Sequence, residues 1–193
     1  MLTATVVRGN IEQTVLATGT LRPARLVAVG SQVSGRITSV DVTLGQTVSA
    51  GDLIAQIDRR TQENALKTAQ AALAASEAQR LEKEASLRLA EITLTRQSGL
   101  YERRAVSQAD VDTARANVDT ANAQIAALDA QIEQGKVAVS NAQTNLGYTR
   151  ITAPIDGTVL AVTSQQGQTL NANQSTPTIV VLGQLDRMTV EAE

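Results

Sequence analysis

The chain contains no cysteine, no histidine, no tryptophan and no phenylalanine, and two tyrosines are its whole aromatic content. Without histidine or cysteine there is no thiolate nucleophile, no Ser-His-Asp triad and no zinc site with the usual ligands. Its 17 basic and 19 acidic residues give no cationic footprint for nucleic acid. Its apolar runs are far shorter than the ~18 residues of a membrane span. We therefore expect no enzymatic activity, no metal or cofactor and no nucleic-acid partner.

The composition divides the chain into three zones. Residues 2–58 and 148–193 are rich in Val, Ile, Thr and Gly and hold all three prolines. Residues 60–146 are rich in Ala, Gln, Glu, Leu and Arg and contain no proline. β-Branched residues favour strands in the two flanks, whereas helix formers without a breaker favour helix in the middle.

A heptad pattern runs through the second half of the middle zone. Every seventh residue from Val111 to Leu146 is apolar, and the interleaved positions from Ala114 to Ala142 are small or apolar. This is an unbroken a/d seam of about five heptads.

The first half of the middle zone carries a weaker seam. Its a positions run from Leu66 to Tyr101 and are interrupted by Arg80, and its d positions are mostly small or polar. We expect this helix to pack less tightly, and we expect the Arg80 side chain to snorkel to solvent.

Helix-end signals lie between and after the two seams. Glu102 to Ser107 is a short polar stretch, Ser107 and Asp110 have the capping-box spacing, and Gly147 follows the last apolar position. These signals predict a second helix that starts at Ser107 and ends in a left-handed glycine C-cap. Two long helices joined by a few residues form an antiparallel coiled-coil hairpin, roughly 60 Å long at 1.5 Å per residue.

The two flanks repeat each other. Residues 35–40 (GRITSV) match residues 157–162 (GTVLAV), and Gly-Gln-Thr recurs at 45–47 and 167–169, each match offset by 122 residues. Two similar β units on either side of the hairpin predict a small pseudo-symmetric sandwich made from both halves. The repeated glycines fit tight turns or positive φ.

The repeated half-motif resembles the biotinyl/lipoyl carrier fold. With a hairpin inserted, the chain resembles the periplasmic adaptors, or membrane fusion proteins, of the HlyD/RND-adaptor superfamily. It is closest to the MacA-type adaptors of ABC tripartite efflux pumps. The stretches that carry the match are Val15–Gly19, Gln32–Gly35, Asn145–Pro154 and Gln166–Thr169. A swinging-arm carrier is not expected, because all three lysines (Lys67, Lys83 and Lys136) lie in the predicted hairpin and none lies on a β-turn.

The resemblance implies an α+β fold in which a long antiparallel coiled-coil α-hairpin is inserted into a lipoyl/biotinyl-like β-sandwich, with partial β-barrel strands. Family members also carry an N-terminal anchor or signal and continue into further domains, so we expect this chain to be a truncated piece. The expected divisions are partial membrane-proximal or β-barrel strands at 1–25, lipoyl-like halves at 26–58 and 148–183, the hairpin at 59–147 and the start of a β-barrel at 184–193.

Two functional features follow from the resemblance alone. Adaptor hairpins carry an Arg-x3-Leu-x6-Ser pattern at the tip that docks the outer-membrane channel, and here it falls on Arg96, Leu100 and Ser107. MacA-like adaptors also place a glutamine on a lipoyl-domain loop, where six copies form a gate ring, and the matching residue is Gln174. From the residues alone, a helix cap is the favoured interpretation of Ser107, a solvated side chain that of Arg96, and a polar loop residue that of Gln174.

The implied function is that of a periplasmic, inner-membrane-associated adaptor in a Gram-negative efflux pump. It would bridge a MacB-like inner-membrane ABC transporter to a TolC-like outer-membrane channel as a homo-hexamer that forms a sealed conduit. A type I protein-secretion adaptor of the same superfamily is the alternative, and a plain coiled-coil scaffold without a conduit is a third hypothesis. The sequence does not distinguish a macrolide, a peptide or a siderophore as the exported substrate.

Overall fold

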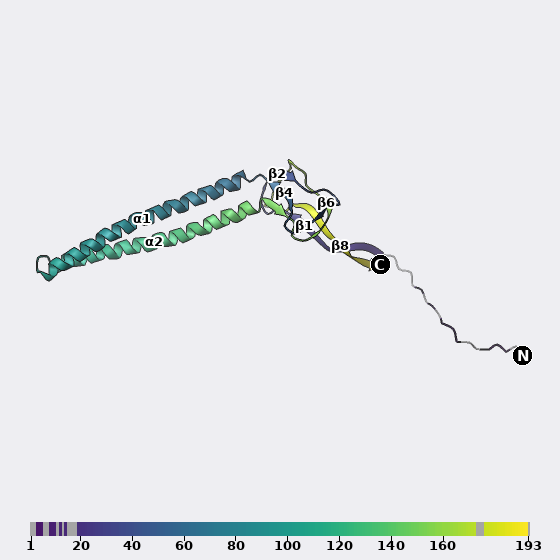
Figure 1. Ribbon diagram of the computed structural model, residues 1–193, viewed down its shortest axis with the longest axis horizontal. Helices are drawn as coiled ribbons and strands as arrows, with labels where there is room; N and C mark the ends of the chain where they lie inside the picture. The colour runs from purple at the N-terminus through teal and green to yellow at the C-terminus, as the bar shows by residue number, and fades with distance from the viewer. Residues whose placement is uncertain are drawn as a thin grey trace.

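The computed structural model describes residues 3–5, 8–10, 12, 14, 19–172 and 176–192. It consists of a long two-helix rod that projects from a small β body (Figure 1). The predicted α+β class is confirmed, with an antiparallel α-hairpin and antiparallel sheets.

The rod is formed by α1 (Arg60–Glu102) and α2 (Gln108–Gly147), of 43 and 40 residues. At 1.5 Å per residue each arm is roughly 60 Å long. The predicted seams face each other: Val111, Ala114, Ala121 and Ile132 are buried on α2. On α1 only Ser76 is buried among the described residues, as its poorer d positions predicted.

The predicted left-handed cap at Gly147 is wrong. Gly147 is the last residue of α2, its φ is not positive, and the C-cap is Tyr148 in the right-handed region at φ −67°. The Tyr148 N–H donates to the Thr144 carbonyl at 3.1 Å, and the Thr149 hydroxyl donates to the Leu146 carbonyl at 2.7 Å. Because these groups satisfy the terminal carbonyls, the chain leaves the helix without a glycine reversal.

The β body consists of two four-stranded antiparallel sheets, in the orders β1-β8-β6-β3 and β5-β4-β2-β7. Most of its buried side chains are aliphatic and form one core between the sheets. The strands are β1 (Gly19–Gly30), β2 (Gly35–Val40), β3 (Thr47–Val48), β4 (Leu53–Ile57), β5 (Arg150–Thr152), β6 (Gly157–Val162), β7 (Thr169–Leu170) and β8 (Thr178–Ala192).

The sequence repeat appears as an exchange of strands between the two halves. β2 pairs with β7, so that Gly35 lies opposite Leu170, and β3 pairs with β6, so that Val48 lies opposite Gly157. These two pairs are related by the repeat offset. The matched turns have the expected positive φ, 81° at Gly45 and 88° at Gly167. Neither half can complete its own sheet, so the two halves must fold together.

Both roots of the hairpin leave the same sheet. β4 runs into α1, α2 runs into β5, and β4 and β5 pair with each other. Beside this pair, the Ile57 N–H donates to the Thr149 carbonyl at 2.9 Å. The Asp58 carboxylate accepts the backbone N–H and the guanidinium of Arg60, and this side-chain bond lowers the pKa of Asp58. The rod is therefore clamped at its base by neighbouring strands.

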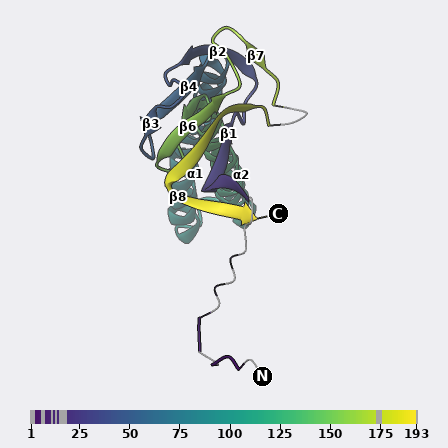
Figure 2. The same ribbon diagram turned by 90° about the vertical axis from the view of Figure 1, so that its right-hand side faces the viewer.

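β1 and β8 continue beyond the sandwich as a two-stranded ribbon (Figure 2). Their pairing extends from Val29 and Val180 inside the body to Gly19 and Ala192 at the far end. The ribbon lies on the side of the body away from the rod (Figure 1).

Candidate docking tip

The distal end of the rod is closed by a compact turn between Glu102 and Gln108. Ser107 is the N-cap of α2, and the predicted capping box is confirmed. The Ser107 side-chain oxygen accepts the Asp110 N–H at 3.3 Å, and the Ser107 N–H donates to the Asp110 carboxylate at 2.9 Å. The hydroxyl also donates to that carboxylate at 2.6 Å, and this bond lowers the pKa of Asp110.

The α1 side of the turn is a Schellman motif with an arginine in the usual glycine position. Arg104 has φ 60°, and it is the one non-glycine residue with positive φ among the described residues. The Arg104 N–H donates to the Tyr101 carbonyl at 2.8 Å, and the Ala105 N–H donates to the Leu100 carbonyl at 2.9 Å. These are the two bonds of the motif. Left-handed backbone strains any side-chain-bearing residue, so the tip retains strain that a glycine would remove.

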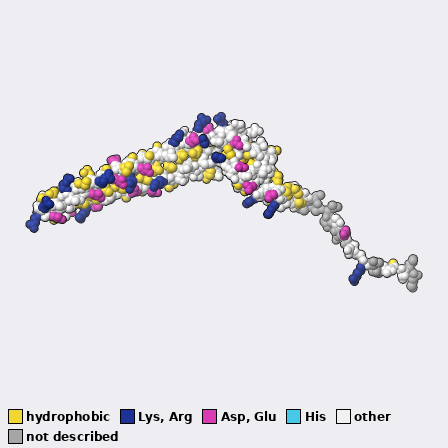
Figure 3. Space-filling view, viewed as in Figure 1, with side chains coloured by type: hydrophobic (Ala, Val, Ile, Leu, Met, Phe, Trp, Pro, Cys, Tyr) yellow, Lys and Arg dark blue, Asp and Glu magenta, His cyan; other side chains and the backbone are white. Residues whose placement is uncertain are grey.

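The structure brings the three sequence-predicted tip residues to this end. Arg96 is exposed near the end of α1, Leu100 is half-buried two residues before the helix ends, and Ser107 is exposed. Tyr101 beside Leu100 is 44% exposed. Basic side chains gather at the same end (Figure 3). The turn adds Arg103 and Arg104 to Arg96. The end therefore offers cationic groups beside partly exposed apolar ones.

Replacing Arg104 with glycine should stabilise the hairpin. Glycine removes the left-handed strain, ~1–2 kcal/mol, against an entropic cost of ~0.5–1 kcal/mol. We expect a gain of about 0.5–1 kcal/mol, seen as a rise in Tm of a few degrees by circular dichroism at 222 nm.

Arg103→Gly is the matched control, because Arg103 has φ −85° and carries no such strain. It should leave the free energy of unfolding unchanged or lower it. Equal stabilisation by both glycine variants would show that loss of charge, and not relief of strain, is the cause.

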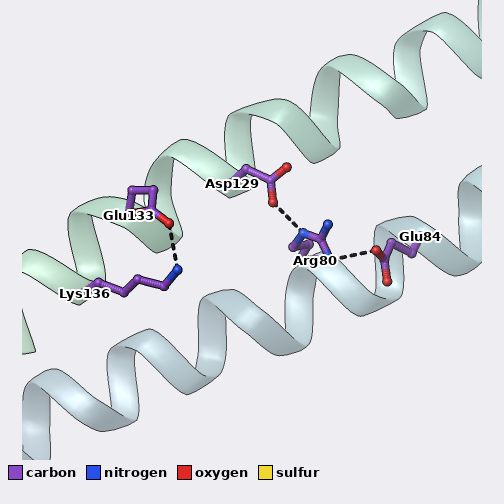
Figure 4. Close-up of polar contacts among 5 residues, drawn as sticks. All are labelled: Arg80, Glu84, Asp129, Glu133 and Lys136. Atoms are coloured by element: carbon purple, nitrogen blue, oxygen red, sulfur yellow. Dashed lines mark hydrogen bonds and ion pairs between the residues drawn. The ribbon is translucent and has the colours of Figure 1, made fainter.

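Halfway along the rod, a polar layer replaces the apolar seam at Arg80 (Figure 4). Its guanidinium pairs with Asp129 of α2 and, at 2.6 Å, with Glu84 of its own helix. The hydrogen bond that the guanidinium donates to the Asp129 carboxylate raises the pKa of Arg80. Lys136 pairs with Glu133 at 2.7 Å on the same side. As predicted, the Arg80 head group reaches the surface, where it also ties the helices together and favours one register.

The predicted gate residue, Gln174, lies outside the described residues, and so do both of its neighbours. β7 leads into this loop, and the Ala172 N–H donates to the Ser34 hydroxyl at 2.9 Å. One root of the loop is thus joined to the segment between β1 and β2.

Arg103 and Arg104 are tip residues that the sequence analysis missed. The turn contains no glycine, proline or asparagine. Without such a residue, the usual signal for a left-handed position was missing. The two adjacent arginines in the predicted turn were the available signal for residues exposed at the tip, because a charged side chain there has no core to enter.

Comparison with known proteins identifies the family of this fold. The family model described as "RND MFP, barrel-sandwich hybrid domain" matches residues 25–182, which include the whole hairpin and most of the β body. The chain belongs to this family. The rod and the two-half sandwich are thus the hairpin and hybrid domain of a membrane fusion protein.

Among curated relatives, this membrane fusion protein is similar to "Macrolide export protein MacA" of Escherichia coli O157:H7, with 42% identity over 96% of the chain and 50% of the relative. It is also 46% identical to "Pyoverdine export membrane fusion protein PvdR" of Pseudomonas putida, over 99% of the chain and 49% of the relative. The chain thus spans about half the length of the curated relatives it matches.

The crystal structure of MacA from Actinobacillus actinomycetemcomitans superposes with a TM-score of 0.91 at 45% identity, over 98% of this chain and 59% of that one. The predicted resemblance to MacA-type adaptors is therefore confirmed. Within the part of the chain that the structure describes, neither helix is long and apolar enough to cross a membrane.

Proposed function

We propose that this membrane fusion protein is the periplasmic adaptor of a tripartite efflux pump. It bridges an inner-membrane ABC transporter of the MacB type to a TolC-like outer-membrane channel, and six copies form a sealed conduit. The adaptor is not an enzyme; its contribution is mechanical.

The geometry that supports this proposal is the rod clamped to a two-half β body. A helix pair roughly 60 Å long can cross a wide gap, and the Arg80–Asp129 pair favours one register of its two helices. The roots at β4 and β5 and the ribbon of β1 and β8 lie at opposite ends of the body (Figure 1). The tip can therefore contact one partner while the ribbon side faces another.

The names of the relatives suggest where the cargo is chosen. One relative is named for macrolide export and another for pyoverdine export, although both match nearly the whole of this chain. We assign cargo selection to the transporter partner, because two relatives named for different cargoes both resemble this one chain.

The bridging function is tested by co-purification. The full-length protein that carries this chain should be isolated from cross-linked cell envelopes together with an ABC transporter and a TolC-type channel. Recovery of the two partners only in separate complexes, never in one, would contradict a bridge. A cell that lacks the adaptor should also lose export through that transporter.

The gate at Gln174 belongs to this proposal. A ring of six amides could close the conduit, since each amide offers both donors and an acceptor to its neighbours. We expect Gln174→Ala to leave assembly intact and to increase backflow of exported solute through the reconstituted conduit several-fold. Gln184→Ala, on β8, is the matched control. The same retention of solute by the Gln174 variant and the unchanged protein would rule the gate out.

A further inference from the structure

The end of α1, residues 97–102, contains a glycine that packing does not require. Outside its own stretch of helix, no heavy atom of the described residues lies within 4 Å of the Cβ that an alanine would place at Gly99. Glycine destabilises a helix relative to alanine, because it loses more backbone entropy on folding. At Gly135 of α2, by contrast, an added Cβ would lie 3.1 Å from Leu73 Cδ1, so close packing accounts for that glycine. Gly99 therefore weakens the end of α1 without a gain in packing.

Gln97 adds a buried amide oxygen that has no partner. Gln97 Oε1 is buried and accepts no hydrogen bond within the part of the chain that the structure describes. Counting along both helices from the contact of Leu73 with Gly135 sets Gln97 level with Val111, which is 6% exposed. A buried acceptor without a donor is destabilising, whereas a leucine at this d position would continue the apolar seam.

A third destabilising feature follows in the turn, where Arg104 is left-handed at φ 60°. Gln97, Gly99 and Arg104 act through different physical effects, which are loss of amide hydration, backbone entropy and steric strain. All three lie in residues 97–104, at the end of the rod away from the β body (Figure 1). Local rules that are broken together at one place are typical of a functional site.

The base of the rod has one of these features and is clamped. Gln62 occupies the same d position of α1 five heptads earlier, and among the described residues its buried Oε1 also has no hydrogen-bond partner. Gly99 is the only glycine of α1. The pair of β4 with β5 and the hydrogen bond of Arg60 with Asp58 hold the base in place. The end of α1 has no such clamp beyond its own turn, so it is the end that opens more easily.

Opening of this end would release groups that a partner can bind. The two hydrogen bonds that close the turn leave the carbonyls of Leu100 and Tyr101 when it opens. The Leu100 side chain, half-buried in the closed turn, and the Tyr101 side chain, 44% exposed, become free to move. Separation from Val111 exposes the amide oxygen of Gln97.

We propose that the end of α1 opens when the tip docks, and that the outer-membrane channel then supplies the hydrogen-bond donor that Gln97 lacks. This rests on the proposed docking and adds Gln97 and Gly99 to the residues that carry it. Because the closed turn is destabilised, the open state is populated before the partner arrives. A change that stabilises the closed turn lowers the apparent affinity by the factor by which it depopulates the open state.

Hydrogen exchange of the free full-length protein tests the opening. Gln97→Leu and Gly99→Ala stabilise the closed turn in different ways, and Gln62→Leu is the matched control, the same substitution at the base. Peptides that cover residues 98–106 should exchange at least about fivefold more slowly in Gln97→Leu and about two- to fivefold more slowly in Gly99→Ala. Gln62→Leu should leave the exchange of these peptides unchanged.

Binding of the same proteins to a TolC-type channel in nanodiscs tests the docking. Biolayer interferometry should show association rates that fall by the same factors as hydrogen exchange. Gly99→Ala should leave the dissociation rate unchanged, whereas Gln97→Leu should raise it, because leucine accepts no hydrogen bond from the channel. Gln62→Leu should associate and dissociate as the unchanged protein does.

Unchanged association of Gln97→Leu and Gly99→Ala, despite slower exchange at the tip, would overturn the inference and leave the bridge standing. An equal loss of binding in Gln62→Leu would do the same, since a stiffer rod and not a closed tip would then be the cause. An unchanged dissociation rate of Gln97→Leu would refute Gln97 as the acceptor. If the unchanged protein binds no channel, both this inference and the proposed function fail.

Discussion

Ser107→Arg should abolish export in cells that have this protein as their sole adaptor, while the rod stays folded. Ser107 is exposed at the distal end and lies on the small turn that closes the hairpin. A long cationic side chain there adds bulk at the docking surface, beside the existing Arg103 and Arg104. The expected measurement is drug susceptibility at the level of a strain that lacks the adaptor, with normal protein abundance.

Ser107→Ala separates docking from helix capping. It removes the hydroxyl that accepts the Asp110 N–H, at a cost of about 1 kcal/mol, but adds no bulk. It should lower the Tm slightly and retain most export. Equal loss of export in both variants would show that the cap, and not the docking surface, is what Ser107 supplies.

Leu100→Ser and Arg96→Asp test the other two tip residues. Both should abolish export with unchanged helix content. Gln143→Arg, an exposed position on α2 near the base, is the control for an added arginine. Full drug resistance in cells that carry either tip variant would refute the assignment of that residue to docking.

Ile57→Ala and Ile179→Ala should each destabilise the β body severely and to a similar extent. The two isoleucines occupy equivalent positions of the repeat, on β4 and β8, and both are 0% exposed. Truncating a buried isoleucine costs ~2–5 kcal/mol, since transfer and cavity terms add. For a chain of this size we expect the Tm to fall by roughly 5–20 °C.

Hydrogen exchange should locate this damage. Protection should fall in β2, β4, β6 and β8 together, because the strand exchange joins both halves in one cooperative unit. Val162→Ala, on the more exposed end of β6, is the control and should cost far less. Loss of protection confined to one half would show that the two halves fold independently.

The sequence predicted well what depends on periodicity. The heptads of residues 60–146 fixed the faces of both helices, because a 3.5-residue repeat leaves one seam to bury. The offset repeat of the flanks predicted two equivalent β units. The capping box at Ser107 was predicted because it is local, three residues from end to end.

Features set by contacts distant in sequence could not be predicted in the same way. Gly147 is not left-handed because Thr149 and the strand that follows it hold the last turn of α2 in the right-handed conformation. The left-handed Arg104 depends on how α1 must bend to meet α2. Neither conformation follows from the identity of the residue alone.

By itself, the sequence determined that this chain is a helical hairpin set between two matching β segments, since composition, heptads and an internal repeat are properties of the linear chain. Only the tertiary structure decided that the two segments exchange strands and that both roots of the hairpin share the pair β4 and β5. The physical reason is that such pairings depend on where residues distant in sequence meet. In the rod, Leu73 meets Gly135 and Arg80 meets Asp129; in the β body, β2 meets β7 and β3 meets β6.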